Sequence, residues 1–200
     1  MVLVHGVNGS SANYKVMIQR LVADGWPKGM LFTIDFPDPK WGCNLGNAKI
    51  VEAVVKQVLV KTGASRVDLV AHSMGTLSTR YFMKNLGGHK LVDTYLTLGG
   101  MHHGLTSPCL SPLDVCVWKE LCASGPFMTQ LNKAPATPGK SRWVSIYGTA
   151  DKTVPNSSSK LTGAENIELK GVAHSGAQGL LERMEAYKHV KRVLQYPPWK

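Results

Sequence analysis

The sequence predicts an α/β fold with a central, mostly parallel sheet of about six strands and helices on both of its faces. Short apolar runs alternate with longer segments of helical periodicity along the whole chain. The apolar runs are continuous, as in strands that are buried on both faces of a parallel sheet. We find no internal repeat and no linker, so we expect a single domain over residues 1–200.

The expected elements follow one another in a regular order. Strands are expected at 2–5, 31–36, 67–71, 92–98, 143–147 and 166–169. Helices are expected at 11–23, 45–62, 74–86, 113–123 and 176–194, the last ending before Pro197 and Pro198. An irregular stretch at about 104–137, rich in proline and cysteine, predicts an excursion from the sheet between the fourth and fifth strands.

The charge of the chain is strongly positive. Lysine and arginine number 23 against 13 aspartate and glutamate residues, a formal net charge of +10. Such a charge attracts polyanions, but the basic residues are scattered, apart from 188–192, and we identify no nucleic-acid-binding motif. We therefore expect no nucleic-acid partner. No apolar run reaches the roughly 18 to 20 residues of a membrane helix, so we expect no stable membrane insertion, and we expect a monomer.

The four cysteines are Cys43, Cys109, Cys116 and Cys122. None shows the C-x-x-C spacing of a zinc or redox site, and two disulfides in an exported protein are the preferred interpretation over free thiols. If 113–122 is helical, Cys116 and Cys122 point away from each other, which disfavours that pair and leaves the other two connectivities open. We expect a secreted protein whose export signal is absent from this chain.

The pentapeptide AHSMG at 71–75 carries the clearest chemical signal. It directly follows the apolar strand VDLVA and directly precedes a helical pattern. A sharp strand-to-helix turn exposes its central residue at the carboxyl edge of the sheet, and small residues two positions away leave room for it. Ser73 is therefore the candidate nucleophile, with Ala71 in place of the more usual first glycine. The alternative is a serine that only caps the helix.

A nucleophile of this kind needs donors for the negative oxygen that forms during attack. The segment VLVHGVNGS at 2–10 reads as a strand that runs into a His-Gly turn. In serine hydrolases with this kind of turn, the loop after an earlier strand supplies one N–H donor, and the residue after the nucleophile supplies the second N–H donor. The segment at 2–10 is in the position of that loop. We expect the N–H groups of Val7 and Met74 to be these donors.

The acid and the base are expected after the nucleophile, at the ends of later strands. Asp151 follows the strand at 143–147, whereas Asp35, Asp68 and Asp93 precede the nucleophile or lie in or at the start of strands. His174 lies in the loop after the last strand. The other histidines fit structural, rim or surface positions: His5, His72, His89, His102, His103 and His189. The order Ser73, Asp151, His174 predicts a serine hydrolase triad.

The blocks VHGVNGS, TGASRVDLVAHSMG, YFMKNLGG, LTLGG, SIYGTAD and GVAHSG resemble, in order, those of the small secreted bacterial triacylglycerol lipases of class 2. This resemblance covers nearly the whole chain. It implies a compact α/β-hydrolase fold, a lipid or ester substrate, and no cofactor. The cysteine-rich stretch at 105–127 is longer than in the smallest members, and one interpretation is a flap over an acyl pocket. Met101 and Leu105 are candidate substrate-binding residues.

The expected function is a serine carboxylester hydrolase, either a lipase or an esterase. The alternatives on the same triad are a polyester hydrolase, thioesterase, amidase or acyltransferase, and a binding protein without catalysis is disfavoured because no triad member is lost. We expect no metal site, because the adjacent His102 and His103 do not readily hold one ion together.

Overall fold

The computed structural model describes residues 1–112 and 114–195. Six strands form one sheet, in the order β2-β1-β3-β4-β5-β6, and every neighbouring pair is parallel. The strands are β1 (Val2–Val4), β2 (Phe32–Ile34), β3 (Val67–His72), β4 (Val92–Leu98), β5 (Arg142–Gly148) and β6 (Glu165–Leu169). The predicted parallel α/β sheet of about six strands is confirmed, with strand bounds close to those expected.

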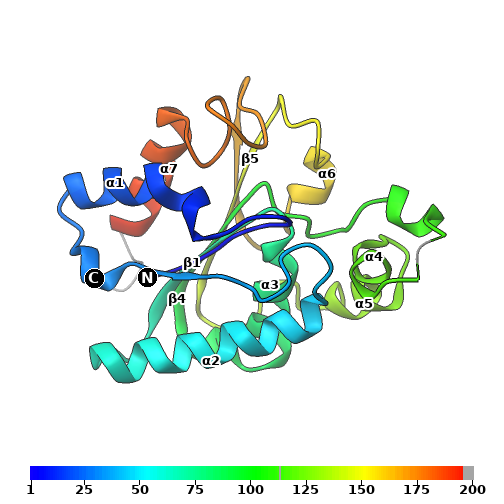
Figure 1. Cartoon of the computed structure of the whole chain (residues 1–200), viewed down its shortest axis with the longest axis horizontal. Coiled ribbons are helices and arrows are strands. Elements are labelled where there is room, and N and C mark those ends of the chain that lie inside the picture. The colour runs from blue at the N-terminus through cyan, green and yellow to red at the C-terminus, as the bar shows by residue number, and fades with distance from the viewer. Residues whose placement is uncertain (113, 196–200) are drawn as a thin grey trace.

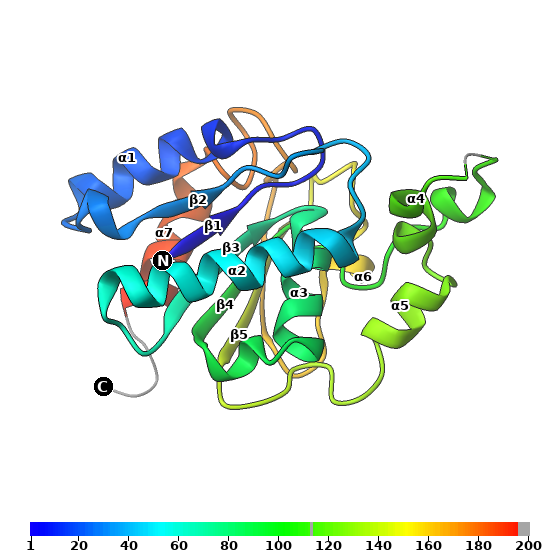
Figure 2. The same cartoon turned by 60° about the horizontal axis from the view of Figure 1, so that its bottom comes forward.

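Helices follow the strands on both sides of the sheet. They are α1 (Lys15–Ala23), α2 (Asn44–Thr62), α3 (Gly75–Asn85), α4 (Cys116–Leu121), α5 (Pro126–Leu131), α6 (Asn156–Ser159) and α7 (Met184–Gln195). Figure 2 shows α2 and α3 on one side of the sheet and α1 and α7 on the other. None of the helices in the described part of the chain is both long enough and apolar enough to cross a bilayer.

The four inner strands contribute side chains to two hydrophobic cores, one on each face of the sheet, whereas each edge strand, β2 or β6, contributes to one core only. Leu3 and Val70 pack on the face that α1 and α7 cover, together with Met17 of α1. Val2 and Val4 pack on the opposite face against α2 and α3. Because both faces are buried, apolar residues occupy successive positions in a strand, which accounts for the continuous apolar runs of the sequence.

Two helix predictions need correction. The helix expected at 176–194 begins only at Met184, because residues 175–183 form tight turns: Gly176 has a φ of 74°, and a Cβ on Gly179 would lie 2.4 Å from the backbone of Ser175. The helix expected at 113–123 is the shorter α4, and residue 113 lies outside the described residues, as do Pro197 and Pro198. The short helices α5 and α6 were not predicted.

The excursion between β4 and β5 carries α4 and α5 at one end of the molecule (Figure 1). The disulfide Cys43–Cys116 joins α4 to the residue before α2, and Cys109–Cys122 closes the excursion on itself. The expectation of two disulfides without a Cys116–Cys122 pair is confirmed. Buried Glu120 of α4 also caps α2 by accepting hydrogen bonds from the backbone N–H groups of its first two residues, 44 and 45.

Side chains of helix α3 form hydrogen bonds with residues near the two ends of the excursion. The fully buried Arg80 donates to the carbonyl of His102 at 2.8 Å and to the side-chain oxygen of Asn132 at 2.7 Å. One turn later, Lys84 donates to the carbonyl of Leu131 at 2.7 Å. Burial lowers the pKa of Arg80 to about 10, which leaves it charged at neutral pH. The excursion is therefore held by hydrogen bonds to two helices as well as by a disulfide.

Candidate active site

The turn between β3 and α3 has the geometry expected of a nucleophile turn. Ser73, its central residue, has a φ of 55°, in the left-handed region that side chains other than glycine rarely occupy. Two glycines make the turn possible. A Cβ on Gly75 would lie 2.2 Å from the carbonyl oxygen of His5, and a Cβ on Gly6 would lie 2.7 Å from the Cβ of Ser73. Ala71, two residues before Ser73, is fully buried in β3 without such a conflict.

Parallel register brings the flanking loops to this turn. Val4 of β1 pairs with Ala71 of β3, so the residues that follow the two strands leave the sheet side by side. Asp151 comes three residues after β5, and His174 comes five residues after β6, at the same carboxyl edge. Three segments that are far apart in the sequence therefore meet above Ser73.

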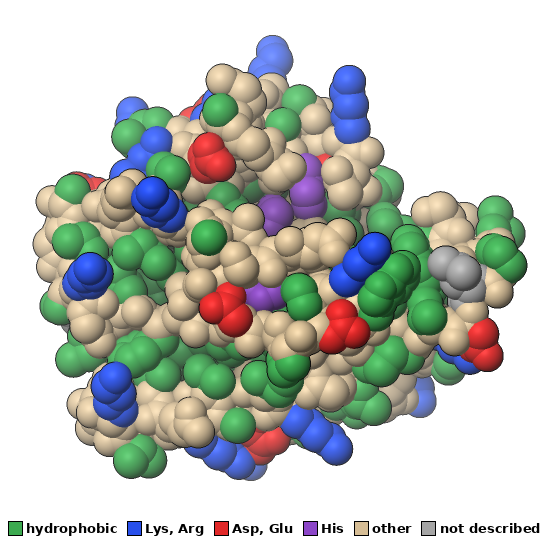
Figure 3. Space-filling view, viewed as in Figure 1, with side chains coloured by type: hydrophobic (Ala, Val, Ile, Leu, Met, Phe, Trp, Pro, Cys, Tyr) green, Lys and Arg blue, Asp and Glu red, His purple; other side chains and the backbone are tan. Residues whose placement is uncertain are grey.

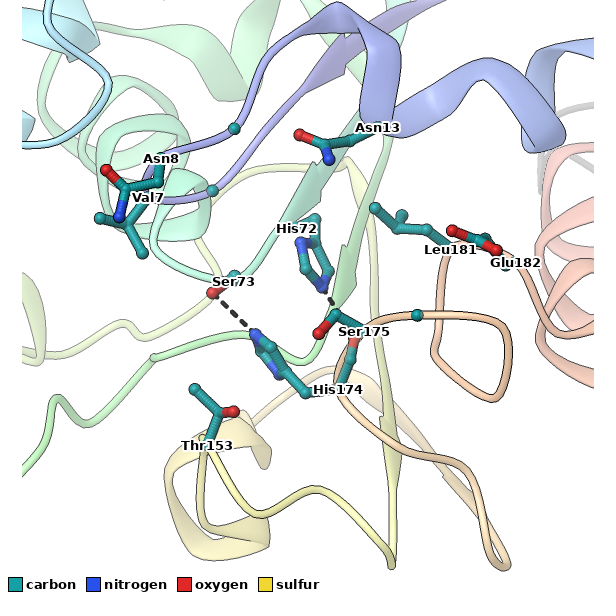
Figure 4. Close-up of a pocket in the computed structure, with 13 residues that line it drawn as sticks. Val7, Asn8, Asn13, His72, Ser73, Thr153, His174, Ser175, Leu181 and Glu182 are labelled. Carbon is teal, nitrogen blue, oxygen red and sulfur yellow. Dashed lines mark hydrogen bonds between the residues drawn. The ribbon is translucent and has the colours of Figure 1, made fainter.

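The three predicted triad residues form one chain of hydrogen bonds. His174 Nε2 lies 2.9 Å from Ser73 Oγ, the contact drawn as a dashed line between these residues in Figure 4. The other ring nitrogen, Nδ1, lies 2.6 Å from Asp151 Oδ2. The carboxylate only accepts, so Nδ1 carries the ring proton and Nε2 is left to accept from the serine hydroxyl. This is the tautomer that a general base needs.

The environment of Asp151 keeps its carboxylate charged. Burial raises the pKa of this carboxyl, but hydrogen bonds outweigh the burial and hold the pKa below its usual value. The donors are His174 Nδ1 on one oxygen and the backbone N–H groups of Thr153 and Val154 on the other, both at 2.8 Å. An ionised and hydrogen-bonded Asp151 fixes the orientation of the imidazole and stabilises its protonated form.

The two predicted oxyanion donors flank Ser73. Among the described residues, neither the Val7 N–H nor the Met74 N–H donates a hydrogen bond to another group of the chain. The loop of Val7 is held from below by His5, whose Nδ1–H donates to the carbonyl of Gly6 at 2.7 Å and whose Nε2 accepts from the Phe36 N–H at 3.2 Å. Both N–H groups are thus available to a ligand, and His5 has a structural role.

A cavity of about 280 Å³ opens in front of Ser73. Its walls come from the loop after β1, the nucleophile turn and the loop that carries His174, and the residues with side chains along it are Val7, Asn8, Asn13, His72, Ser73, Thr153, His174, Ser175, Leu181 and Glu182 (Figure 4). Histidine side chains reach the surface near the middle of the face in Figure 3, and hydrophobic side chains gather beside them toward the excursion. The cavity is at the small end of ligand pockets.

Several lining residues were not identified from the sequence. Asn8 and Ser175 adjoin predicted site residues, so their proximity to Val7 and His174 was the available signal. Leu181 and Glu182 fell inside a segment expected to be helical, which hid their position at the cavity. His72 lines the cavity too, and its ring packs against that of His174 at a centroid distance of 4.7 Å, with an angle of 38° between the ring planes.

The two candidate substrate-binding residues lie elsewhere. Met101 is buried, and Leu105 is half-buried beside the excursion, where its backbone pairs with that of Cys122. Neither lines the cavity. Both belong to a third hydrophobic cluster, between α3 and the helices of the excursion, which also contains Met74 and Met128. Their role in substrate binding stays a prediction.

The rival histidines and aspartates have other partners. His102 is fully buried and pairs with Thr97 Oγ1 at 3.0 Å, and His103 Nε2 donates to the carbonyl of Lys160 at 3.0 Å. Asp93 forms an ion pair with Arg66 at 2.8 Å. The described residues contain no group of three or more histidine, cysteine, aspartate or glutamate side chains that could hold a metal ion.

Comparison with known proteins places this site in a family. The family model described as "Lipase (class 2)" matches residues 1–195. The chain belongs to the class 2 lipase family. A triacylglycerol lipase from Pseudarthrobacter phenanthrenivorans is 32% identical over 109 residues, which are 52% of this chain and 33% of that protein. One from Burkholderia plantarii matches to the same extent, over 30% of its length. The matches span about a third of these relatives.

Solved structures agree on the fold. The mature lipase BlEst2 of Bacillus licheniformis has a TM-score of 0.80 at 18% identity, covering 96% of this chain and 90% of that one. The phospholipase PlaB of Legionella pneumophila has a TM-score of 0.80 at 15% identity, covering 98% of this chain and 60% of that one. The predicted α/β-hydrolase fold and the resemblance to class 2 lipases are both confirmed.

Proposed function

We propose that this protein is a serine carboxylester hydrolase that cleaves acyl esters of the lipid class. Ser73 is the nucleophile, His174 the general base and acid, and Asp151 the residue that orients His174. The observation that carries the proposal is the continuous hydrogen-bond chain from Ser73 Oγ through the His174 ring to Asp151, at 2.9 and 2.6 Å. Membership of the class 2 lipase family supports the ester as the substrate class.

The reaction follows from this geometry in two halves. His174 Nε2 takes the proton of Ser73 as Oγ attacks the ester carbonyl carbon, and the N–H groups of Val7 and Met74 stabilise the oxyanion that forms. The intermediate collapses with loss of the alcohol, whose oxygen receives the proton from Nε2, and leaves an acyl ester on Oγ. Water then attacks the acyl carbon and gives a proton to Nε2. As the bond from the acyl carbon to Oγ breaks, Nε2 returns this proton to Ser73 Oγ, and the carboxylic acid leaves.

The size of the cavity favours short acyl chains. At about 280 Å³ it is small, and both polar and apolar side chains line it. The long apolar side chains Met74, Met101 and Met128 pack into the cluster beneath the excursion instead of toward Ser73. We therefore expect the specificity constant kcat/KM to peak at short acyl chains, with longer chains lying along the surface beside the cavity.

Export is part of the same proposal. Two disulfides, Cys43–Cys116 and Cys109–Cys122, involve all four cysteines. Disulfides form and persist in oxidising compartments, outside the cytosol of most organisms. This supports a secreted enzyme that acts on lipid esters.

The experiment compares the wild-type protein, Ser73→Ala and Ser157→Ala on p-nitrophenyl esters from acetate to palmitate and on emulsified triglyceride. Ser157, in α6, is exposed and controls for the substitution itself. We expect Ser73→Ala to lower turnover by about 10⁴- to 10⁶-fold, and Ser157→Ala to leave it unchanged. A wild-type protein that is inert on every ester contradicts the proposal, and turnover of thioesters or amides alone points to the other chemistries of the same triad.

A further inference from the structure

His72 is a buried histidine next to the nucleophile that the proposed mechanism leaves without a role. It is the last residue of β3, is 7% exposed, and lines the cavity beside His174 (Figure 4). Its Nε2 lies 3.1 Å from the main-chain carbonyl oxygen of His174. The side chain that precedes the nucleophile therefore holds the backbone of the residue that serves as its base.

The protonation state of His72 follows from this contact and from burial. A carbonyl oxygen only accepts, so Nε2 carries a proton and donates it to the hydrogen bond. Burial, together with the neighbouring ring of His174, lowers the pKa of His72 to about 3, although the hydrogen bond to the His174 carbonyl and the Asp151 carboxylate act in the opposite direction. The ring is neutral at the pH of ester hydrolysis, so the donor is present throughout the reaction.

The loop that carries His174 has few other attachments on the side of Ser73. On its far side, the Ala150 N–H donates to the carbonyl of Val172 at 3.1 Å, and the loop closes on itself through the Leu180 N–H and the carbonyl of Ala173 at 3.1 Å. Residues 175–178, which follow His174 directly, are exposed. Among the hydrogen bonds of the described residues, the one from His72 joins this loop to the nucleophile turn without using the catalytic ring itself.

We propose that His72 is a positioning residue, which holds the main chain of His174 so that its Nε2 stays within reach of Ser73 Oγ while protons are transferred. The inference rests on the proposed function of the triad. The hydrogen bond between Ser73 and His174 is lost when Oγ becomes acylated, whereas the bond from His72 involves no transferred proton. It thus keeps the imidazole in place for the alcohol and then for the attacking water, where a displacement of about 1 Å costs on the order of 10²-fold in rate.

The test compares two substitutions of nearly equal shape. His72→Gln keeps a neutral N–H donor, and His72→Met removes the donor while filling similar space. We expect KM for p-nitrophenyl butyrate to be similar in both variants and kcat of His72→Gln to exceed that of His72→Met by about 10- to 100-fold. If the ring only fills space, the two variants have equal kcat, and this outcome overturns the proposal.

A control and a measurement without variants complete the test. His89 Nδ1 donates to the carbonyl of Met83 at 2.9 Å away from the cavity, so the same pair of substitutions there is expected to leave kcat unchanged. In the wild-type protein, ¹⁵N NMR is expected to show His72 with a proton on Nε2 and no titration near pH 6.5, the ordinary histidine pKa. A His72 ring that titrates there, or that carries its proton on Nδ1, overturns the proposal even if both variants fail to fold.

Proton NMR spectra of the wild-type protein and of the two His72 variants distinguish a failure of this inference from a failure of the proposed function. The proton between His174 Nδ1 and Asp151 is expected to give a sharp low-field signal in the wild-type protein and in His72→Gln, and an exchange-broadened signal in His72→Met. A wild-type protein without ester turnover contradicts the proposed function only. An equally sharp signal in both variants contradicts the role of His72, whatever the substrate is.

Discussion

The left-handed backbone conformation of Ser73 predicts an unusual order of stability for substitutions at this position. At an ordinary helical position, alanine is more stabilising than glycine by about 0.5 to 1 kcal/mol, because glycine loses more backbone freedom on folding. At Ser73, with a φ of 55°, we expect the opposite order: Ser73→Gly is more stable than Ser73→Ala. Both variants lose the hydrogen bond from Oγ to His174, so this loss cancels from the comparison.

The magnitude follows from two opposing terms. A residue with a Cβ in the left-handed region costs about 1 to 2 kcal/mol, which glycine avoids. Against this gain stands the entropy of glycine in the unfolded chain, about 0.5 to 1 kcal/mol. Glycine at position 73 is therefore expected to raise the free energy of unfolding by roughly 0.5 to 1 kcal/mol relative to alanine. Both variants lack the nucleophile and are expected to be inactive.

Urea unfolding followed by circular dichroism measures the difference. Ser78 provides the matched control, because it is a buried serine inside helix α3, five residues further along. There, glycine is expected to be less stable than alanine by about 1 kcal/mol. If alanine is the more stable residue at both positions, the strain assigned to the nucleophile turn does not exist in the protein.

Three further predictions concern the frame of the site. Gly75→Ala places a Cβ 2.2 Å from the carbonyl oxygen of His5. We expect the free energy of unfolding to decrease by about 1 to 3 kcal/mol and ester turnover to be reduced. Unchanged stability and turnover contradict this prediction. Replacing Cys43 and Cys116 by serine opens a loop with a sequence separation of 73 and is expected to lower the free energy of unfolding in urea by about 4 kcal/mol. A loss under about 1 kcal/mol contradicts this estimate. Because the pKa of folded His72 is about 3 and that of the unfolded residue about 6.5, the unfolded chain binds an extra proton between these values. The free energy of unfolding therefore decreases as the pH is lowered through this range, by up to about 1.4 kcal/mol per pH unit. His72→Gln is expected to flatten this slope, and an unchanged slope refutes the assigned pKa.

The parts of the fold that the sequence predicts are those with a strong local signal. Strands buried on both faces give continuous apolar runs, and α2 ends just before Gly63, whose φ of 68° favours glycine. Helices α5 and α6 have six and four residues, too few to establish a helical period. The start of α7 was placed too early because its turns are set by close backbone packing at Gly179, which sequence periodicity does not report.

The candidate site divides in the same way. Ser73, Asp151 and His174 could be predicted to lie together because each follows a strand, and parallel strands end at a common edge. The hydrogen bond from His72 to the carbonyl of His174 joins residues 102 positions apart and depends on how two loops fold, so no local pattern announces it. The sequence also did not show that Met101 belongs to the third hydrophobic cluster and not to the cavity lining, because this too depends on how the loops fold.

The attachment of the excursion has an evolutionary consequence. Its contacts with α2 and α3, through Cys116, Glu120 and the carbonyls that Arg80 and Lys84 bind, are independent of the turns that carry the triad. Its outer part is therefore a natural insertion point: chain can be exchanged there between fixed anchors while the reacting groups keep their places. Changes in the length or sequence of this outer part are therefore expected to leave the hydrogen bonds among Ser73, His174 and Asp151 unaltered.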